Sequence, residues 1–257
     1  MSLDPPHAVP PTLRVLENVL PPQTIEILNG LNAWALGDRP AQSAGLAGRK
    51  SEKTLRDMIA EGTIGHPRGL FALFKGTEIE AVWHEVLGPD IALCLSSTIM
   101  RDFNPVNRPT PARWHYDAFL LGMSTPMLNT WVPLNDVGVT APGMTMCRIP
   151  HWPHDYWQRA VEIADENGMI PATRQEEVKY SNDEILALAE KEPESPIFDT
   201  VLNAGDVIVF DHQHIHGTQH SLVNAGRRRS LEIRVVSLKS ALHLRDVGNP
   251  HMFIPFE

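Results

Sequence analysis

The stretch NAGDVIVFDHQHIHGTQHSLVNAGRRRSLEIRVV, residues 203–236, contains two β-rich segments on either side of a histidine-rich loop. Gly205-Asp206 is a turn signal, and the apolar run from Val207 to Phe210 follows it directly. Beyond the histidines, three consecutive arginines open the second segment. Short apolar runs bounded by turn residues are typical of strands in an antiparallel β-structure, so this stretch predicts two such strands.

Similar segments recur from about residue 90 onward, and Pro, Gly, Asn and Asp separate them. They read IALCLSSTIMRDF, RWHYDAFLLGM, MLNTWVPLND, GMTMCRIP, AGDVIVFDHQHIHG and RSLEIRVVSL. Residues 152–196 interrupt this pattern with two acidic segments of helical periodicity, PHDYWQRAVEIADENG and SNDEILALAEKEPE. The chain before residue 90 favours helices, at PPQTIEILNGLNAW, AGRKSEKTLRDMIAEG and TEIEAVWHEVLGP.

Helices that precede a set of antiparallel strands predict an α+β fold with a mainly β core, as a β-sandwich or jelly roll. We expect a single domain over residues 1–257. It would comprise a helix-rich part (1–89), a jelly-roll core (90–238) with the helical insertion 152–196, and a C-terminal tail (239–257). The insertion is placed to act as a lid over a small molecule or as a dimer contact.

Composition limits the possible partners and the compartment. The formal net charge of −9 argues against nucleic acid or an anionic membrane surface as the main partner. The longest apolar runs are far shorter than a membrane span. Cys94 and Cys147 form no disulfide framework, and the N-terminus is polar and Pro-rich, so we expect a cytoplasmic protein.

The segment ARWHYDAFLLG, residues 112–122, places a polar pair, His115 and Asp117, in an otherwise apolar strand. Residues two apart on a strand point to the same face, so the imidazole and the carboxylate share one side, along which Phe119 and Leu121 continue. Taken alone, the pair fits either a hydrogen-bonded His–Asp pair in the core or two ligands of a metal ion.

The histidine-rich loop offers a third ligand among His212, His214, His216 and His220. Two neutral imidazoles and one carboxylate on one face of an ion, with open positions opposite, form the facial triad of non-haem Fe(II) oxygenases. The sequence therefore predicts an iron site, provided that one of these histidines lies beside the His–Asp pair.

Three features occur in a specific order: His115-x-Asp117, then Gly205-Asp206 with an apolar strand leading to His216-Gly217, then an arginine opening the next strand. This order resembles the Fe(II)/2-oxoglutarate-dependent dioxygenases, and more closely their phytanoyl-CoA dioxygenase-like branch, over roughly residues 90–238. The resemblance implies a double-stranded β-helix (jelly roll, cupin-like) flanked by helices. It also implies that His115, Asp117 and His216 bind Fe(II), with 2-oxoglutarate as co-substrate and O2 as oxidant.

His216 is preferred as the third ligand because a glycine follows it, at the family's distance from the Gly-Asp turn; His214 is the alternative. The remaining histidines are expected to be loop residues or to hold a ligand's ring by hydrogen bonds. The family's R-x-S pattern matches Arg228-x-Ser230, which implies that Arg228 grips the distal carboxylate of 2-oxoglutarate. Strand alternation turns Arg228 away from both neighbouring arginines, and Arg227 is the alternative.

The other expected site residues are less specific. Thr218 is a candidate hydroxyl donor to the co-substrate, and Trp131 on the strand after the H-x-D motif is a candidate pocket wall. Phe119, Arg148 and His151 are candidate contacts for the substrate. Ordinary packing, turn or surface roles are the alternatives for all five.

The resemblance also implies a reaction. Halogenating relatives replace the carboxylate ligand with a small residue, whereas this chain keeps Asp117, so we expect hydroxylation or a related desaturation, cyclisation or epoxidation. The substrate is expected to be a free small metabolite, including a natural-product intermediate, and the acidic surface gives no reason to expect a CoA thioester. The protein would be a monomer or homodimer. Two alternatives are another cupin-like metalloenzyme that does not use 2-oxoglutarate and a metal-free jelly-roll binding protein.

Overall fold

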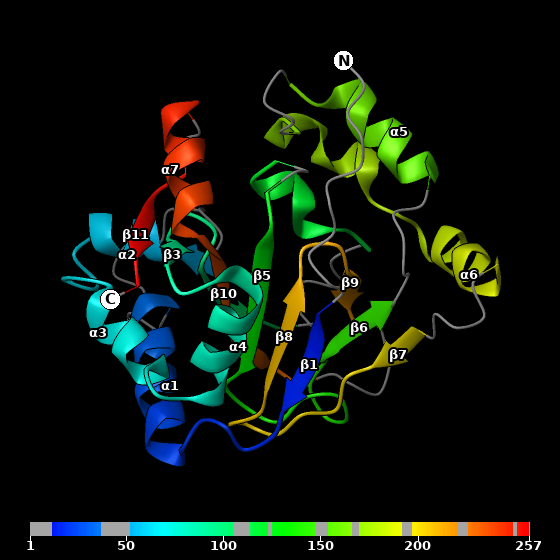
Figure 1. The fold of residues 1–257 in the computed structure, drawn as a ribbon. Coiled ribbons are helices and arrows are strands. Elements are labelled where there is room, and N and C mark those ends of the chain that lie inside the picture. The colour runs from blue at the N-terminus through cyan, green and yellow to red at the C-terminus, as the bar shows by residue number, and fades with distance from the viewer. Residues whose placement is uncertain are drawn as a thin grey trace, which may run out of the picture.

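The computed structural model describes residues 12–36, 52–104, 114–122, 125–147, 154–165, 170–191, 197–219, 226–248 and 251–256. Within these residues, two antiparallel β-sheets pack against each other, and helices cover the outer face of the larger sheet (Figure 1). This arrangement of helices around an antiparallel core agrees with the predicted fold class. None of the helices in these ranges is both long and apolar enough to cross a membrane.

The larger sheet has eight strands in the described residues, in the order β1-β8-β5-β10-β3-β11. Strand β4 pairs with the first half of β10, and β2 pairs with β4. The strands are β1 (Leu13–Leu16), β2 (Glu52–Thr54), β3 (Ile91–Cys94), β4 (Ile99–Phe103), β5 (Met127–Pro133), β8 (Val207–Asp211), β10 (Arg228–Ser237) and β11 (Phe253–Pro255).

Strand β10 divides its side chains between the two faces of this sheet. Leu231, Ile233 and Val235 are fully buried in the core beneath the helices. The alternate residues Arg228, Ser230, Glu232 and Arg234 therefore face the other way, toward the smaller sheet. The predicted segment RSLEIRVVSL is thus the central strand of the sheet, with an apolar outer face and a charged inner face.

The predicted turn at Gly205-Asp206 leads into β8. Gly205 has a φ of 108°, in the left-handed region that favours glycine. The Asp206 carboxylate accepts hydrogen bonds from the amide N–H groups of Asn203 (2.7 Å) and Asn18 (2.8 Å). This acid therefore holds the turn in place, which is a structural function.

The smaller sheet has the order β7-β6-β9 and consists of β6 (Met144–Cys147), β7 (Ile197–Asp199) and β9 (Ile215–Thr218). Side chains of β6 pack against Trp131, Ile208 and Phe210 from the inner face of the larger sheet. These contacts hold the two sheets together, and Met144, Trp131 and Phe210 also border the cavity between them.

The helices outside the insertion are α1 (Pro22–Leu36), α2 (Leu55–Ala60), α3 (Arg68–Phe71), the 3-10 helix η1 (Ala72–Phe74), α4 (Glu78–Leu87) and α7 (Leu238–Asp246). The main core lies between the large sheet and α1 to α4. At its centre, the buried indole of Trp83 donates a hydrogen bond of 2.8 Å to Thr130 Oγ1 on β5. The predicted helix over AGRKSEKTLRDMIAEG is shorter than expected, because residues 52–54 pair with β4 and the Thr54 side chain caps α2.

The insertion between β6 and β7 contains α5 (His154–Ile163), the 3-10 helix η3 (Ala172–Val178) and α6 (Asn182–Lys191). Its buried residues form a small core of their own, and this core includes Tyr116, Ala118 and Ile215. Each of these three residues is a direct chain neighbour of a predicted metal ligand. The insertion is therefore packed onto the segments that carry the predicted ligands.

The prediction that RWHYDAFLLGM forms a strand is wrong. In the described part of this segment, Trp114 and His115 make isolated bridges to Tyr180 and His216, and Asp117–Leu120 forms the 3-10 helix η2. The backbone leaves the sheet after His115, so the side chains beyond it no longer alternate along one face. Likewise, IALCLSSTIMRDF forms two strands, because Ser97 and Thr98 bond back to the Cys94 carbonyl in a turn between β3 and β4.

Candidate functional site

A cavity of about 720 Å³ lies between the inner faces of the two sheets. Strands β4, β5, β8 and β10 of the large sheet form one wall, and β6 and β9 of the small sheet, with the segment around His115 and Asp117, form the other. Gln175, Glu176 and Lys179 of the insertion also line the cavity. The insertion therefore borders this space, as the lid hypothesis requires.

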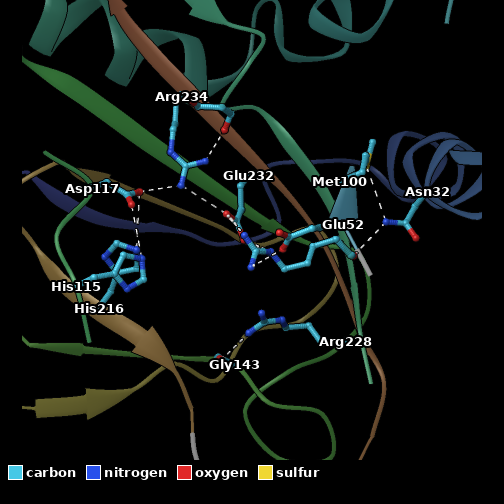
Figure 2. Close-up of polar contacts among 12 residues, drawn as sticks. Asn32, Glu52, Met100, His115, Asp117, Gly143, His216, Arg228, Glu232 and Arg234 are labelled. Carbon is cyan, nitrogen blue, oxygen red and sulfur yellow. Dashed lines mark hydrogen bonds and ion pairs between the residues drawn. The ribbon is translucent and has the colours of Figure 1, made fainter. Parts of the chain in front are cut away.

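Three predicted ligands meet at the edge of this cavity. One ligand atom from each of His115, Asp117 and His216 lies within 4.8 Å of the other two, a separation that one metal ion can bridge. His115 Nε2 is 3.6 Å from Asp117 Oδ1, and His216 Nε2 is 3.8 Å from Asp117 Oδ2. Figure 2 shows both rings on the same side of the carboxylate.

The backbone brings these residues together across the sheet. His115 and His216 exchange both of their N–H to carbonyl hydrogen bonds, each 3.0 Å long, which places their rings 4.4 Å apart. Asp117 then lies at the first position of η2, where the chain turns toward the large sheet. The predicted pair therefore lies together beside His216, but a bridge followed by a 3-10 turn holds it, not a continuous strand.

The tautomer of His216 follows from its hydrogen bond. Its Nδ1 lies 3.0 Å from the backbone carbonyl oxygen of His214. Because a carbonyl only accepts, Nδ1 carries the hydrogen, and the Nε2 lone pair is directed at the cluster. The ring of Phe210 packs edge-on against the imidazole of His216, with 4.9 Å between the ring centroids, and limits its rotation.

Arg234 holds the carboxylate of Asp117 from the large sheet. Its Nη2 donates a hydrogen bond of 2.9 Å to Asp117 Oδ2, and its Nη1 donates to the carbonyl oxygen of Ser97. Burial opposes ionisation of Asp117, but the charge and the hydrogen bond of Arg234 outweigh it and lower the pKa of the carboxyl. Asp117 is therefore ionised at neutral pH, as a metal ligand must be.

The charges continue along the cavity wall in alternating sign (Figure 2). Glu232 Oε2 lies 3.6 Å from Arg234 Nη2, and Glu232 Oε1 lies 2.9 Å from Arg101 Nε. Arg101 Nη1 in turn lies 3.2 Å from Glu52 Oε2. Burial opposes ionisation of Glu232, but Arg101 and Arg234 outweigh it and lower its pKa. These groups therefore neutralise one another within the wall.

Arg228 differs from the other arginines of this wall. Its side chain is buried, and Nη1 donates to the Gly143 carbonyl at 3.1 Å, but Nε has no partner and no carboxylate of a described residue forms an ion pair with it. Burial and the charge of Arg101 lower the pKa of Arg228 to about 10, so it stays charged at neutral pH. A buried cation without a counter-ion is costly, which points to an anionic ligand.

The structure also separates Arg228 from Arg227. Arg227 is exposed and forms an ion pair with Asp102, whereas Arg228 faces the cavity between the rings of Phe103 (5.2 Å) and Trp131 (5.8 Å). The predicted register of β10, with Arg228 and Ser230 on the inner face, agrees with this burial.

Of the weaker candidates, Trp131 and Thr218 line the cavity, and Trp131 Nε1 has no hydrogen-bond partner. Ser230 is fully buried on the same face as Arg228, and its hydroxyl also has no partner. Arg148 and His151 lie outside the described residues, and so does the side chain of Phe119.

On the η2 segment, Leu120 lines the cavity in addition to Asp117. Leu121 is buried in another cluster, with residues of β3 and α7. The prediction that Leu121 shares a face with Asp117 therefore fails, because a 3-10 turn repeats every three residues and lacks the two-residue alternation of a strand.

The neighbouring histidines have structural surroundings. His214 is buried with Nδ1 3.2 Å from Asp211 Oδ2, away from the cavity, which argues against it as the third ligand. Asp211 also accepts hydrogen bonds from the amide N–H groups of Thr12 and Gln213. The ring of His212 accepts a hydrogen bond from the amide of Met127. His220 lies outside the described residues.

Sequence reasoning missed several residues of the cavity, namely Asn129, Arg101, Glu232, Arg234 and His251. For two of them a signal was present, since Glu232 and Arg234 continue the alternation that begins at Arg228 and Ser230. The contact of Arg234 with Asp117 depends on how η2 turns, which no local pattern indicates.

The chain matches the family model described as phytanoyl-CoA dioxygenase (PhyH) over residues 15–230. Among solved structures, it is similar to the non-heme alpha ketoglutarate dependent carbocyclase SnoK from nogalamycin biosynthesis, with 17% identity, a TM-score of 0.56, and 89% of this chain and 80% of that chain covered. It is also similar to the epimerase SnoN from the same biosynthesis, with 17% identity, a TM-score of 0.53, and 89% of this chain and 79% of that chain covered. A third similar structure is EctD from S. alaskensis with bound Fe, with 14% identity, a TM-score of 0.58, and 90% of this chain and 74% of that chain covered. No curated protein matches the sequence.

At these identities the solved structures show the fold, and the predicted jelly-roll class is confirmed. The family match covers most of the chain, including the predicted triad and Arg228. The expected cofactors, Fe(II), 2-oxoglutarate and O2, are those of the family, and a His-Asp-His cluster suited to a metal ion is present. The chain therefore belongs to the phytanoyl-CoA dioxygenase (PhyH) family of Fe(II)/2-oxoglutarate-dependent oxygenases.

Proposed function

We propose that this oxygenase hydroxylates a small molecule without net charge in the cavity between its two sheets. The observation that carries the proposal is one cavity with a His-Asp-His cluster on one wall and a buried arginine, free of any described carboxylate, on the other. The overall reaction would convert substrate, O2 and 2-oxoglutarate to hydroxylated substrate, succinate and CO2.

In this proposal, His115, Asp117 and His216 hold Fe(II). The donor set fits the ion, because two imidazoles and one carboxylate bind Fe(II) and leave open positions for other ligands. Fe(II) with 2-oxoglutarate and O2 supplies the oxidation of a substrate C–H bond. The chain's own contribution is to keep Asp117 ionised through Arg234, to fix the His216 tautomer through the His214 carbonyl, and to shield the site from water.

Arg228 would bind the distal carboxylate of 2-oxoglutarate. The guanidinium presents a planar fork that can bind a carboxylate through two hydrogen bonds, and its Nε is without a partner. Phe103 and Trp131 flank it with aromatic rings. Thr218 and Ser230 would supply further hydroxyl contacts, since Thr218 lines the cavity and the Ser230 hydroxyl lacks a partner.

The charge balance of the cavity supports a substrate without net charge. The described pairs are Arg234 with Asp117, Arg101 with Glu232 and Glu52, and Lys179 with Glu176. Arg228 is the described cavity cation outside these pairs, and 2-oxoglutarate would take it. A substrate with a net charge would then lack a counter-ion, whereas the neutral polar groups of Ser96, Gln175 and His251 can hydrogen-bond an uncharged one. A polyanionic CoA thioester does not suit this balance.

We infer that the insertion closes over the substrate. Gln175, Glu176 and Lys179 reach the cavity from η3 and the residue after it, and the small core of the insertion rests on the segments that carry the triad. Closing such a segment over bound substrate excludes water from the oxidation.

The experiment is a screen of small metabolites with Fe(II), 2-oxoglutarate and O2, in which succinate is measured. The proposal expects iron-dependent succinate that rises most with uncharged or zwitterionic polar compounds, and a product heavier by one oxygen atom. A product lighter than the substrate by two hydrogens would show that the reaction is a desaturation or a cyclisation and not a hydroxylation. Substrate turnover that is independent of 2-oxoglutarate, or a preference for CoA thioesters, would contradict the proposal.

A further inference from the structure

Asn129, on β5, has a buried side-chain amide without hydrogen-bond partners. Its side chain is 4% exposed and lines the cavity, yet neither Nδ2 nor Oδ1 bonds to any described residue. Buried polar side chains are nearly always paired, because an amide that loses water without gaining a partner costs free energy. The amide is therefore placed for a group that the chain itself does not supply.

The sheet register locates this amide beside the triad. Asn129 lies opposite Arg234 on β10 and opposite Phe210 on β8. Arg234 bonds to Asp117, and Phe210 packs against the ring of His216. Asn129 therefore stands on the large sheet between the two residues that support the triad.

Other unpartnered polar atoms continue along the same wall. Trp131 Nε1, Ser230 Oγ and Arg228 Nε are buried without partners, on the inner faces of β5 and β10. Trp131 lies opposite Glu232, and Ser230 lies opposite Pro133, so these positions lead from Asn129 toward Arg228. A row of unpaired donors that ends in a buried cation suits an elongated ligand with acceptors at both ends.

We propose that Asn129 binds the end of 2-oxoglutarate nearest the triad, with Nδ2 donating to its C1 carboxylate while Arg228 holds the distal carboxylate. The inference rests on the proposed use of 2-oxoglutarate at this site and adds a second polar anchor on the large sheet. Arg234, the cation opposite Asn129, already donates to Asp117 and Ser97 through its two Nη atoms, whereas neither polar atom of the Asn129 side chain has a partner.

The test compares Asn129→Leu and Asn129→Asp with the unmodified protein. Anaerobic titration with 2-oxoglutarate in the presence of Fe(II), followed by the visible charge-transfer band, gives the affinity without turnover. Loss of a hydrogen bond to a charged group should weaken binding about tenfold in Asn129→Leu. Asn129→Asp should weaken it more, because a second carboxylate would face the ligand.

Thermal unfolding of the metal-free protein supplies an independent readout. Asn129→Leu removes an unpaired buried amide, so its melting temperature should stay the same or rise by about 3 °C. The matched control is Asn32→Leu, since Asn32 is equally buried but its Nδ2 donates to the carbonyl of Arg101 at 3.1 Å. This control should lower the melting temperature and leave 2-oxoglutarate affinity within twofold.

Unchanged affinity in both Asn129 variants, with normal binding by the unmodified protein, would overturn this inference and leave the proposed function intact. A lower melting temperature in Asn129→Leu with unchanged affinity would assign the amide a purely structural function and would overturn it as well. If the unmodified protein bound Fe(II) without binding 2-oxoglutarate, the proposed function and this inference would both fail.

Discussion

The two sheets contribute different parts of the site. The small sheet and its bridged segment carry His115, Asp117 and His216, the proposed metal ligands. The large sheet carries Arg228, which we assign to the co-substrate, and Arg234. Among the described residues, the ion pair between Arg234 and Asp117 joins the two sides directly. Metal binding and co-substrate binding should therefore be separable by mutation on either side and coupled at this pair.

The two sides also differ in how they are held. Regular ladders order the large sheet, including seven residue pairs between β10 and β5. On the triad side, His216 lies on β9 and pairs with the short strand β6, whereas His115 is held by one bridge to His216 and by a small core that is shared with the insertion. We expect the triad side to be the less stable of the two in the metal-free protein, because it has fewer ladder bonds and a smaller apolar core.

The largest effect should come from the small-sheet side. Asp117→Ala removes one of three donors and the only carboxylate of the described cluster, so we expect Fe(II) binding and iron-dependent 2-oxoglutarate turnover to be abolished. Anaerobic Fe(II) titration and succinate release measure the two losses, and His216→Ala should behave in the same way. Turnover that persists in either variant would contradict the assignment of the triad.

The next effect tests the pair that joins the sheets. Arg234→Leu leaves the buried carboxylate of Asp117 without its cation, so we expect the metal-free protein to lose about 3 kcal/mol in its free energy of unfolding. Because Fe(II) restores a positive charge beside Asp117, the metal should stabilise this variant more than the unmodified protein. Urea unfolding with and without Fe(II) measures both quantities.

The matched control is Arg227→Leu, which breaks the pair between an exposed guanidinium and Asp102. It should cost clearly less than Arg234→Leu, because the Arg227 side chain is 54% exposed and water can take the place of its guanidinium beside Asp102. If the Arg234 and Arg227 variants lose the same free energy of unfolding, the pair between Arg234 and Asp117 contributes no more to stability than a pair at the surface.

The third effect should be confined to the large-sheet side. We expect Arg228→Ala to weaken 2-oxoglutarate binding at least tenfold while Fe(II) binding is retained, because a charge-assisted pair with a carboxylate is lost. Arg228→Lys should recover only part of the affinity, since lysine cannot reproduce the planar fork. The control is Arg227→Ala. If Arg228→Ala binds 2-oxoglutarate as tightly as this control does, Arg228 does not bind the co-substrate.

The smallest effect concerns Asp211, a buried carboxylate of the large sheet with no metal assigned to it. Burial opposes its ionisation, but the neighbouring His214 and the backbone amide of Thr12 outweigh burial and lower its pKa. A lowered folded-state pKa stabilises the protein above the unfolded-state pKa of about 3.9, and this contribution disappears as the pH falls through the folded-state value.

Asp211→Asn should therefore cost about 1 kcal/mol at pH 7, and the difference from the unmodified protein should shrink toward pH 3. Urea unfolding across this pH range measures it, while Fe(II) affinity should stay unchanged. A loss of metal binding in Asp211→Asn would mean that the large-sheet carboxylate also supports the triad.

Much of the site could be predicted from the sequence because its signals are local. His115 and Asp117 are two residues apart, and His216 is marked by the glycine that follows it and by the turn before β8. Alternation along β10 predicts that Arg228 and Arg227 face opposite sides of the sheet, and the burial of Arg228 and the exposure of Arg227 agree with this.

The rest could not be predicted because it depends on contacts between distant segments. No local pattern shows that η2 turns Asp117 toward Arg234, or that residues 52–54 pair with β4 before α2 begins. Asn129 lies beside Thr130 in an otherwise apolar strand, and only the absence of a partner distinguishes it from a satisfied core amide. Where a hydrogen bond or ion pair links residues far apart in sequence, periodicity carries no information about it.

The most direct test of the division between the two sheets is an anaerobic titration of the metal-free protein with Fe(II) and then with 2-oxoglutarate. We expect one Fe(II) per chain to bind first, and a weak visible charge-transfer band to appear only when 2-oxoglutarate follows. Asp117→Ala should lose both steps, whereas Arg228→Ala should keep the first and need at least tenfold more 2-oxoglutarate for the second. Metal binding without a band at any 2-oxoglutarate concentration, or no metal binding at all, would contradict the proposed site.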